Sequence, residues 1–164
     1  MKHLVKKAMA GNKDAFVQLM EMNTQSMYKV ARAYFTSDAD VADAISETVL
    51  ICFEQLDTLR KPEYFKTWMT RILINHCYDI LRERSDYVDL DCCEEPAQCD
   101  EYNIEFKEAL SSVDERYRLP MELYYGQGFK VKEIAEILSM PPNTIKTYLS
   151  RGRKQIAKYY GKEL

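Results

Sequence analysis

The stretch KEIAEILSMPPNTIKTYLSRGRK, residues 132–154, decides the fold of the C-terminal part of the chain. Its apolar residues recur at helical spacing on both sides of a turn at residues 139–142, which predicts two short helices joined by that turn. Ala135 is the small residue that a close helix crossing requires, and Ile145 and Leu149 are apolar anchors for the second helix. The stretch therefore predicts a helix-turn-helix of the type that binds DNA.

One residue of the turn departs from the usual form of this motif. Ser139 stands where such turns often carry glycine. If this residue must adopt a left-handed backbone conformation, its Cβ destabilises the turn by about 1 kcal/mol relative to glycine.

The second helix of the motif becomes polar and basic toward its C-terminal end. Because Ile145 and Leu149 take the buried face, hydroxyl and basic side chains are left on or near the opposite surface. Lys and Arg contact phosphates or guanine edges, and Thr and Ser suit bases or phosphates. The candidate DNA-contacting residues are Thr144, Lys146, Thr147, Ser150, Arg151 and Arg153. An ordinary helical hairpin with a solvated basic face is the alternative interpretation.

The charge of the whole chain, −3, is unusual for a protein that binds nucleic acid. The charges are divided into blocks of opposite sign. Residues 36–59 and 86–105 carry carboxylates and no Lys or Arg, whereas residues 60–84 and 143–164 are basic on balance. The local sign, acting within a Debye length of roughly 8–10 Å, sets what each surface attracts. The net charge therefore does not exclude DNA binding.

Helical periodicity and a lack of alternating β-branched runs predict an all-α fold. Three amphipathic segments within residues 12–82 are expected to bury a small core, to which Trp68 contributes most. Shorter helices are expected after residue 104, with a kink or local break at Pro120. We therefore predict two small helical domains joined by an acidic linker. Their bounds are 1–85 for the first domain, 86–103 for the linker and 104–164 for the second domain.

Several classes of protein are not supported by the sequence. The five cysteines are odd in number, and Cys92, Cys93 and Cys99 match no structural zinc spacing, so reduced thiols are favoured over a metal or redox site. The chain shows no catalytic constellation and no glycine-rich phosphate loop, so we expect no enzyme, cofactor or metal. No segment has the length of a membrane span or the pattern of a signal peptide, which predicts a cytoplasmic protein.

Taken together, these segments resemble a bacterial sigma factor of the extracytoplasmic-function (ECF) type, which consists of regions 2 and 4 joined by a linker. DVADAISETVL, residues 40–50, resembles the region 2 helix that binds the β′ clamp helices of RNA polymerase. FKTWMTRILINHCYDILR, residues 65–82, resembles the promoter-melting helix. Residues 129–154 resemble region 4, which reads the −35 element and touches the β flap. The resemblance implies that the first domain is the region 2 bundle and the second is the region 4 helix-turn-helix.

The resemblance also assigns roles to individual residues. It implies that a base flipped out of the −10 element stacks on Tyr64, with basic and polar neighbours on the single strand. The implied −10 contacts are Arg60, Lys61, Tyr64, Arg71 and Asn75. The implied polymerase-binding residues are Asp40, Asp43 and Glu47, which lie along one side of a helix. In region 4, Lys146, Thr147, Ser150 and Arg151 are implied for base edges or nearby backbone, and Thr144 and Arg153 for phosphates.

The implied function is to direct core RNA polymerase to specific promoters for transcription initiation. The implied partners are core RNA polymerase, through its β′ clamp helices and β flap, promoter DNA and an anti-sigma factor. No small-molecule substrate is expected, and the free protein is expected to be a monomer. Two other classes stay open at this point: a one-component helix-turn-helix regulator with a sensing or dimerising bundle, and an adaptor bundle whose basic helix is only a solvated surface.

Overall fold

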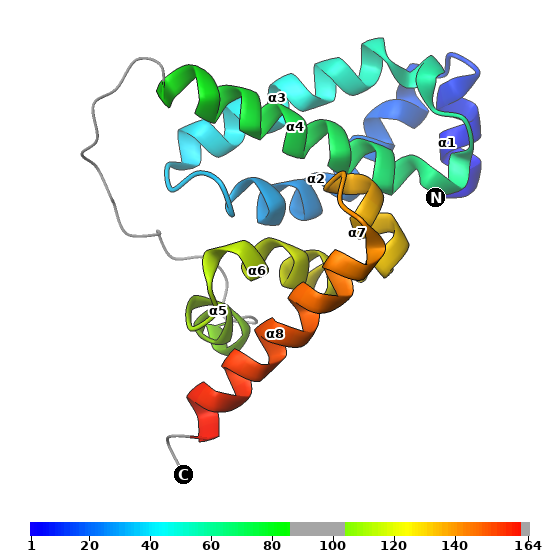
Figure 1. The fold of residues 1–164 in the computed structure, drawn as a ribbon. Helices are drawn as coiled ribbons and strands as arrows, with labels where there is room; N and C mark the ends of the chain where they lie inside the picture. The colour runs from blue at the N-terminus through cyan, green and yellow to red at the C-terminus, as the bar shows by residue number, and fades with distance from the viewer. Residues whose placement is uncertain (86–103, 162–164) are drawn as a thin grey trace. The chain divides into compact units, whose positions relative to one another are not determined.

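The computed structural model describes residues 1–85 and 104–161, which form helices and connecting turns (Figure 1). These residues divide into two compact units, 1–85 and 104–161, each with its own core. The predicted all-α class is therefore confirmed. The predicted acidic linker, residues 86–103, lies outside the described residues. No helix within the described ranges is long and apolar enough to cross a lipid bilayer.

The first unit is a bundle of three long helices with a short helix packed against it (Figure 1). Its elements are α1 (Lys2–Met9), α2 (Lys13–Ala31), α3 (Asp38–Glu54), the 3₁₀ turns η1 (Leu56–Thr58) and η2 (Pro62–Tyr64), and α4 (Phe65–Ser85). The sequence analysis did not predict α1, which buries only Val5 and Ala8 and packs mainly on α2. Asn12 caps α2 by accepting a hydrogen bond from the backbone N–H of Ala15, 2.9 Å away.

The core of the first unit is centred on α4 and α2. Phe65, Met69, Leu73 and Ile74 of α4 are fully buried, and Leu19 and Met27 of α2 are buried with them. Trp68 is only half-buried, and its indole Nε1 donates a hydrogen bond to Thr58 Oγ1 at 3.1 Å. The largest side chain that is fully buried in this unit is therefore Phe65, and Trp68 lies at the margin of the core. Its ring covers the edge of the core, where the N–H can reach a partner.

The second unit is formed by shorter helices that pack around α8. Its elements are α5 (Ile104–Ser111), α6 (Glu115–Met121), the π-helical turn η4 (Glu122–Gly126), α7 (Val131–Ile137) and α8 (Pro142–Gly161). Pro120 lies inside α6, which ends at Met121, one residue after it. Because proline lacks an N–H and crowds the preceding turn, the predicted local break is confirmed as a change from α to π geometry.

The helix-turn-helix formed by α7 and α8 follows the prediction closely. Ala135, Ile145 and Leu149 are buried, and the backbone N–H of Met140 donates to the carbonyl of Ala135 at 2.9 Å to close the turn. Ser139 has φ of 52°, so this residue does adopt the left-handed conformation. The serine therefore carries the strain that glycine would avoid, about 1 kcal/mol.

Gly152 allows α8 to pack closely on α6. It is buried, and a Cβ at this position would overlap Met121 Sδ, which is itself buried. A larger residue would therefore force the helices apart or displace a packed methionine. The close crossing holds α8 in place and leaves the opposite side of this helix to solvent.

Candidate nucleic-acid interface

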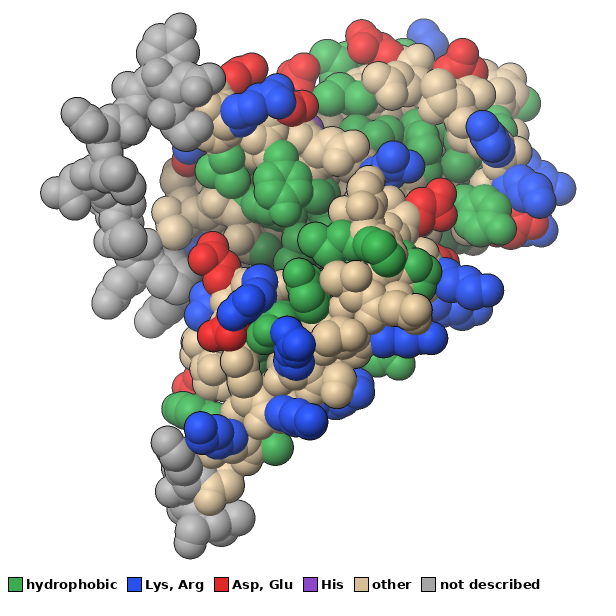
Figure 2. Space-filling view, viewed as in Figure 1, with side chains coloured by type: hydrophobic (Ala, Val, Ile, Leu, Met, Phe, Trp, Pro, Cys, Tyr) green, Lys and Arg blue, Asp and Glu red, His purple; other side chains and the backbone are tan. Residues whose placement is uncertain are grey.

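The exposed side of α8 carries the residues that the sequence predicts for DNA contact. Proline at the start of the helix suits this position because the first N–H groups of a helix have no internal partner. Figure 2 shows Lys and Arg side chains gathered along this helix. Lys146, Thr147, Arg151 and Arg153 are exposed, and Thr144 and Ser150 are half-buried. With Ile145 and Leu149 buried, the arrangement is a basic, hydroxyl-bearing face opposite an apolar one.

Two of these side chains are already held by neighbours. Thr147 Oγ1 donates to the carbonyl of Asn143 at 2.9 Å, which leaves its oxygen as an acceptor. Arg153 Nη1 donates to the hydroxyl oxygen of Tyr125 at 2.9 Å. This hydrogen bond holds the pKa of Arg153 above its ordinary value, because the charged guanidinium is the better donor. The sequence analysis identified Arg153 but missed Tyr125, which lies in the π turn that follows Pro120.

In the first unit, the chain separates two neighbouring aromatic rings at the start of α4. Tyr64 is 49% exposed, whereas Phe65 is 0% exposed and sits in the core. Arg60 and Lys61, which precede this pair, are also exposed. The result is an aromatic ring at the surface with two cations next to it in the chain. Such a combination suits an unstacked base and the adjacent phosphates.

Further along α4, Arg71 and Asn75 are exposed and lie four residues apart, on one side of the helix.

The η2 turn that leads into α4 is tied to α1 by an ion pair between Lys2 Nζ and Glu63 Oε1, 2.6 Å apart. The hydrogen bond from Lys2 also keeps the pKa of Glu63 below its ordinary value. The sequence analysis missed this contact because it spans 61 residues and involves the unpredicted helix α1.

The acidic face of α3 is divided by its ion pairs. Asp43 and Glu47 are exposed, whereas both carboxylate oxygens of Asp40 accept hydrogen bonds from Arg84, at 3.0 and 2.6 Å. The guanidinium of Arg84 also lies 5.6 Å from the centre of the Phe35 ring. These bonds hold the pKa of Asp40 below its usual range. Asp40 therefore ties the first turn of α3 to the last turn of α4.

The acidic face continues into exposed apolar side chains on the same helix. Leu50 is 49% exposed and Phe53 is 48% exposed, and the Phe53 ring packs edge-on against Phe16 with 5.2 Å between centroids. The sequence analysis considered neither residue for a site. Adjacent apolar pairs such as 49/50 and 52/53 are the signal for a helix that is apolar beyond one face.

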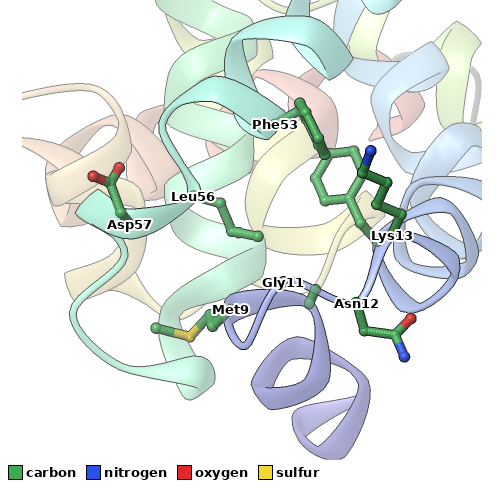
Figure 3. Close-up of a pocket in the computed structure, with 9 residues that line it drawn as sticks. Met9, Gly11, Asn12, Lys13, Phe53, Leu56 and Asp57 are labelled. Carbon is green, nitrogen blue, oxygen red and sulfur yellow. The ribbon is translucent and has the colours of Figure 1, made fainter.

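Phe53 also lines an open hollow of about 310 Å³ between the α1–α2 turn and the end of α3 (Figure 3). Met9 and Leu56 provide further apolar walls, and Lys13 and Asp57 bring one charge of each sign. The exposed acids, the exposed apolar residues and the hollow form one surface, which we call the α3 face and define by Asp43, Glu47, Leu50 and Phe53. Such a mixture of charge and apolar area is typical of a protein-binding surface.

The cysteines in the described ranges are unsuited to redox or metal chemistry. Cys52 and Cys77 are free and fully buried, and burial raises the pKa of each thiol to about 12. Both thiols are therefore protonated at neutral pH. Residues 1–85 and 104–161 contain no group of three or more side chains placed to hold a metal ion. Cys92, Cys93 and Cys99 lie outside these ranges.

Comparisons with known proteins agree with this geometry. Residues 19–86 match the family described as "Sigma-70 region 2", and residues 104–156 match "Sigma-70, region 4". The chain is 30% identical over 135 residues to RNA polymerase sigma factor SigV of Bacillus subtilis (strain 168). The aligned part covers 79% of this chain and 81% of SigV. It is 22% identical over 178 residues to the ECF sigma factor SigW of the same organism, which covers 96% and 95% of the two chains.

Two solved structures have the same fold. The structure of CnrH in complex with the cytosolic domain of CnrY matches with a TM-score of 0.72 and 21% identity, over 99% of this chain and 98% of that chain. The sigma factor RpoE in complex with the anti-sigma factor NepR, from Bartonella quintana, matches with a TM-score of 0.71 and 24% identity. This match covers 90% of this chain and 96% of that chain.

The chain belongs to the ECF group of the sigma-70 family of RNA polymerase sigma factors. It binds core RNA polymerase and promoter DNA, and serves promoter recognition through regions 2 and 4 without catalysing a reaction of its own. The predicted family and function are confirmed. The alternatives of a one-component regulator and an adaptor bundle are set aside by the matches to both regions.

Proposed function

We propose that this sigma factor reads its promoters at two surfaces, with α8 on the −35 element and residues 60–75 on the melted −10 element. The observation that carries this proposal is the separation of Tyr64 from Phe65, because it leaves one aromatic ring free for a base. Extruding a base costs a few kcal/mol, and stacking on an aromatic ring returns about 1–3 kcal/mol per base. Arg60 and Lys61 then bind phosphates of the single strand. Arg71 and Asn75, which lie further along α4, contact the melted −10 element as well.

At the −35 element, we propose that α8 enters the major groove with its exposed side toward the bases. Lys146, Thr147, Ser150 and Arg151 take base edges or nearby backbone, and Thr144 and Arg153 take phosphates. This proposal is supported by the exposure of Lys146, Thr147, Arg151 and Arg153 and by the burial of Ile145 and Leu149. A bidentate base contact discriminates against the wrong base by about 1–3 kcal/mol.

We further propose that core RNA polymerase docks its β′ clamp helices on the α3 face. Asp43 and Glu47 attract a basic partner surface and set its orientation, which raises the association rate. Leu50 and Phe53 then supply buried apolar area, worth about 1.5–3 kcal/mol for each side chain that becomes fully covered. Asp40 contributes indirectly, because its carboxylate is occupied by Arg84 and holds the start of α3 against α4.

The remaining partners are proposed from the family. CnrH was solved with CnrY, and RpoE with the anti-sigma factor NepR. We propose that an anti-sigma factor binds this chain too, that region 4 touches the β flap, and that the free protein is a monomer. Because core polymerase acts on the chromosome, the protein is proposed to work in the cytoplasm.

In vitro transcription with core RNA polymerase over a promoter library tests the two-surface proposal. The wild-type chain is expected to initiate at a defined set of promoters. Tyr64→Ala is expected to reduce open-complex formation at these promoters, and Tyr64→Phe to retain most of it because stacking needs only the ring. Tyr78→Ala, which removes another exposed ring of region 2, is the matched control. The proposal is wrong if no promoter in the library depends on this chain, or if Tyr64→Ala and Tyr78→Ala behave alike.

A further inference from the structure

Two exposed side chains from different elements meet beside α8. Tyr125 belongs to the π turn Glu122–Gly126 and is 44% exposed, and Arg153 belongs to α8. The guanidinium Nη1 of Arg153 donates to the hydroxyl oxygen of Tyr125 at 2.9 Å, across 28 residues of sequence. The tyrosine ring is also packed edge-on against Tyr124, with 4.8 Å between the ring centroids. The contact therefore joins the π turn to the DNA-facing side of the recognition helix.

The backbone geometry places Tyr125 in this position. A Cβ on Gly126 would overlap the carboxylate of Glu122, so glycine lets that side chain fold over the turn. Gln127 Nε2 then donates to Glu122 Oε1 at 3.2 Å, and the backbone N–H of Gln127 donates to the Glu122 carbonyl at 3.0 Å. π-helical turns are rare and frequently mark functional sites. Here the π turn is the element that presents the tyrosine hydroxyl to α8.

The hydrogen-bonding capacity of the pair defines its ligand. The hydroxyl of Tyr125 accepts from Arg153, so its own hydrogen is left to donate outward. Arg153 has five N–H donors and the hydrogen bond to Tyr125 uses one of them. Both side chains can therefore donate to one external group, and the guanidinium adds a positive charge. A group that only accepts hydrogen bonds and carries negative charge fits this site.

The position of Arg153 on α8 indicates which anion the site would bind. Arg153 lies seven residues after Lys146 and three after Ser150, on neighbouring turns of the same side of the helix. A group bound at Arg153 therefore lies at the edge of the surface proposed to enter the major groove. There the acceptor-only anion is the phosphate of the duplex backbone.

We propose that Tyr125 and Arg153 together form a binding site for one backbone phosphate of the −35 duplex, with the tyrosine hydroxyl as a direct donor to it. The inference rests on the proposed role of α8 and adds a residue outside the helix-turn-helix to its DNA contacts. Tyr125 has two functions in this site: it orients the guanidinium and it donates its own hydrogen. Because a phosphate contact carries no sequence information, the site strengthens binding to all promoters alike.

Promoter affinity of the reconstituted holoenzyme, measured across a range of salt concentrations, tests this inference. Tyr125→Phe keeps the ring and removes the hydroxyl, and it is expected to weaken affinity about three- to tenfold without changing the preferred −35 bases. Tyr124→Phe is the matched control, because it removes the hydroxyl of the adjacent ring. Its affinity is expected to equal that of the wild type.

Two further variants separate a phosphate contact from other roles. Arg153→Gln removes the charge, and it is expected to lower the slope of log affinity against log salt by about one. Adding Tyr125→Phe to Arg153→Gln is expected to weaken binding by less than Tyr125→Phe does alone, because both residues serve one phosphate. Thermal unfolding of each variant is measured alongside, and equal melting temperatures assign the loss to binding.

The outcomes are distinguishable. If the wild-type holoenzyme binds no promoter, the proposed function of α8 fails. If it binds and Tyr125→Phe matches Tyr124→Phe, the phosphate site is wrong. A changed −35 base preference in Tyr125→Phe would identify a base contact instead, and weaker binding to core polymerase in the absence of DNA would identify a polymerase contact. Either result overturns the inference.

Discussion

The α3 face and the exposed side of α8 are both helix surfaces, and they differ in more than the sign of their charge. The α3 face combines the carboxylates Asp43 and Glu47 with two large apolar side chains that are about half exposed. Between residues 146 and 153, α8 exposes charged and hydroxyl groups and no large apolar side chain. Apolar area stabilises a protein–protein interface, whereas a nucleic-acid surface depends on charge and hydrogen bonds. The difference fits the partners that we propose for the two surfaces.

The largest expected effect comes from removing the charges of α8. Lys146→Ala combined with Arg151→Ala is expected to weaken promoter binding by the holoenzyme at least about 30-fold, since each contact is worth about 1–3 kcal/mol. Affinity for core polymerase is expected to stay unchanged. Lys6→Ala combined with Lys7→Ala removes the same charge from exposed positions on α1, outside this surface, and is the control. Equal losses in the two double variants would show that only total charge matters.

The reciprocal experiment addresses the α3 face. Leu50→Ala combined with Phe53→Ala is expected to weaken binding to core polymerase about tenfold or more, because it removes apolar area that docking would bury. Val17→Ala combined with Met22→Ala, at exposed apolar positions on α2, is the control and is expected to have little effect. Binding is measured by competition for core polymerase with another sigma factor. A loss shared by both double variants would break the contrast drawn between the two surfaces.

The packing of α8 on α6 depends on the absence of a side chain at Gly152. Gly152→Ala is expected to lower the free energy of unfolding of region 4 by about 1–3 kcal/mol through overpacking against Met121, although alanine favours the helix by about 1 kcal/mol. Thermal unfolding measures the change. Met121→Ala in the same chain is expected to recover part of the loss, so that the double variant is more stable than the sum of the single effects. Additive effects would show that the crossing is not the cause.

At the start of α3, the ion pair between Asp40 and Arg84 contributes to stability by electrostatics. Its removal is expected to have the smallest effect of these changes. The pKa of Asp40 is lowered in the folded chain by Arg84, so the pair contributes stability above the ordinary carboxyl pKa, and this contribution is lost as pH falls through the folded pKa. The difference in free energy of unfolding between the wild type and Asp40→Asn is therefore expected to shrink on acidification. Gly152→Ala is expected to show no such trend. A difference that does not change with pH would contradict the ion-pair explanation.

Local sequence patterns were sufficient for part of this molecule. The all-α class, the burial of Ile145 and Leu149 and the break at Pro120 all follow from periodicity or from the chemistry of one residue. Periodicity was not sufficient where apolar residues are adjacent in a helix. It does not show that Phe53 is 48% exposed, or that Phe65 and not Trp68 is the largest fully buried side chain.

Contacts between distant segments could not be predicted from the sequence. Arg84 reaches Asp40 across 44 residues, and Arg153 reaches Tyr125 across 28. Each contact adds to what the sequence shows of a residue: Asp40 links two helices, and the guanidinium of Arg153 is held by the hydroxyl of Tyr125. Helix α1 was missed because two buried residues leave too little periodicity to detect.

The separation of Tyr64 from Phe65 also bears on how promoter preference diverges among related sigma factors. A change at the exposed Tyr64 alters the proposed base contact and is expected to shift stability by only about 0.5 kcal/mol. Truncation of the buried Phe65 to alanine costs about 3–5 kcal/mol, because the bundle loses its largest fully buried side chain. We therefore expect substitutions at Tyr64 to change promoter preference while the bundle remains intact.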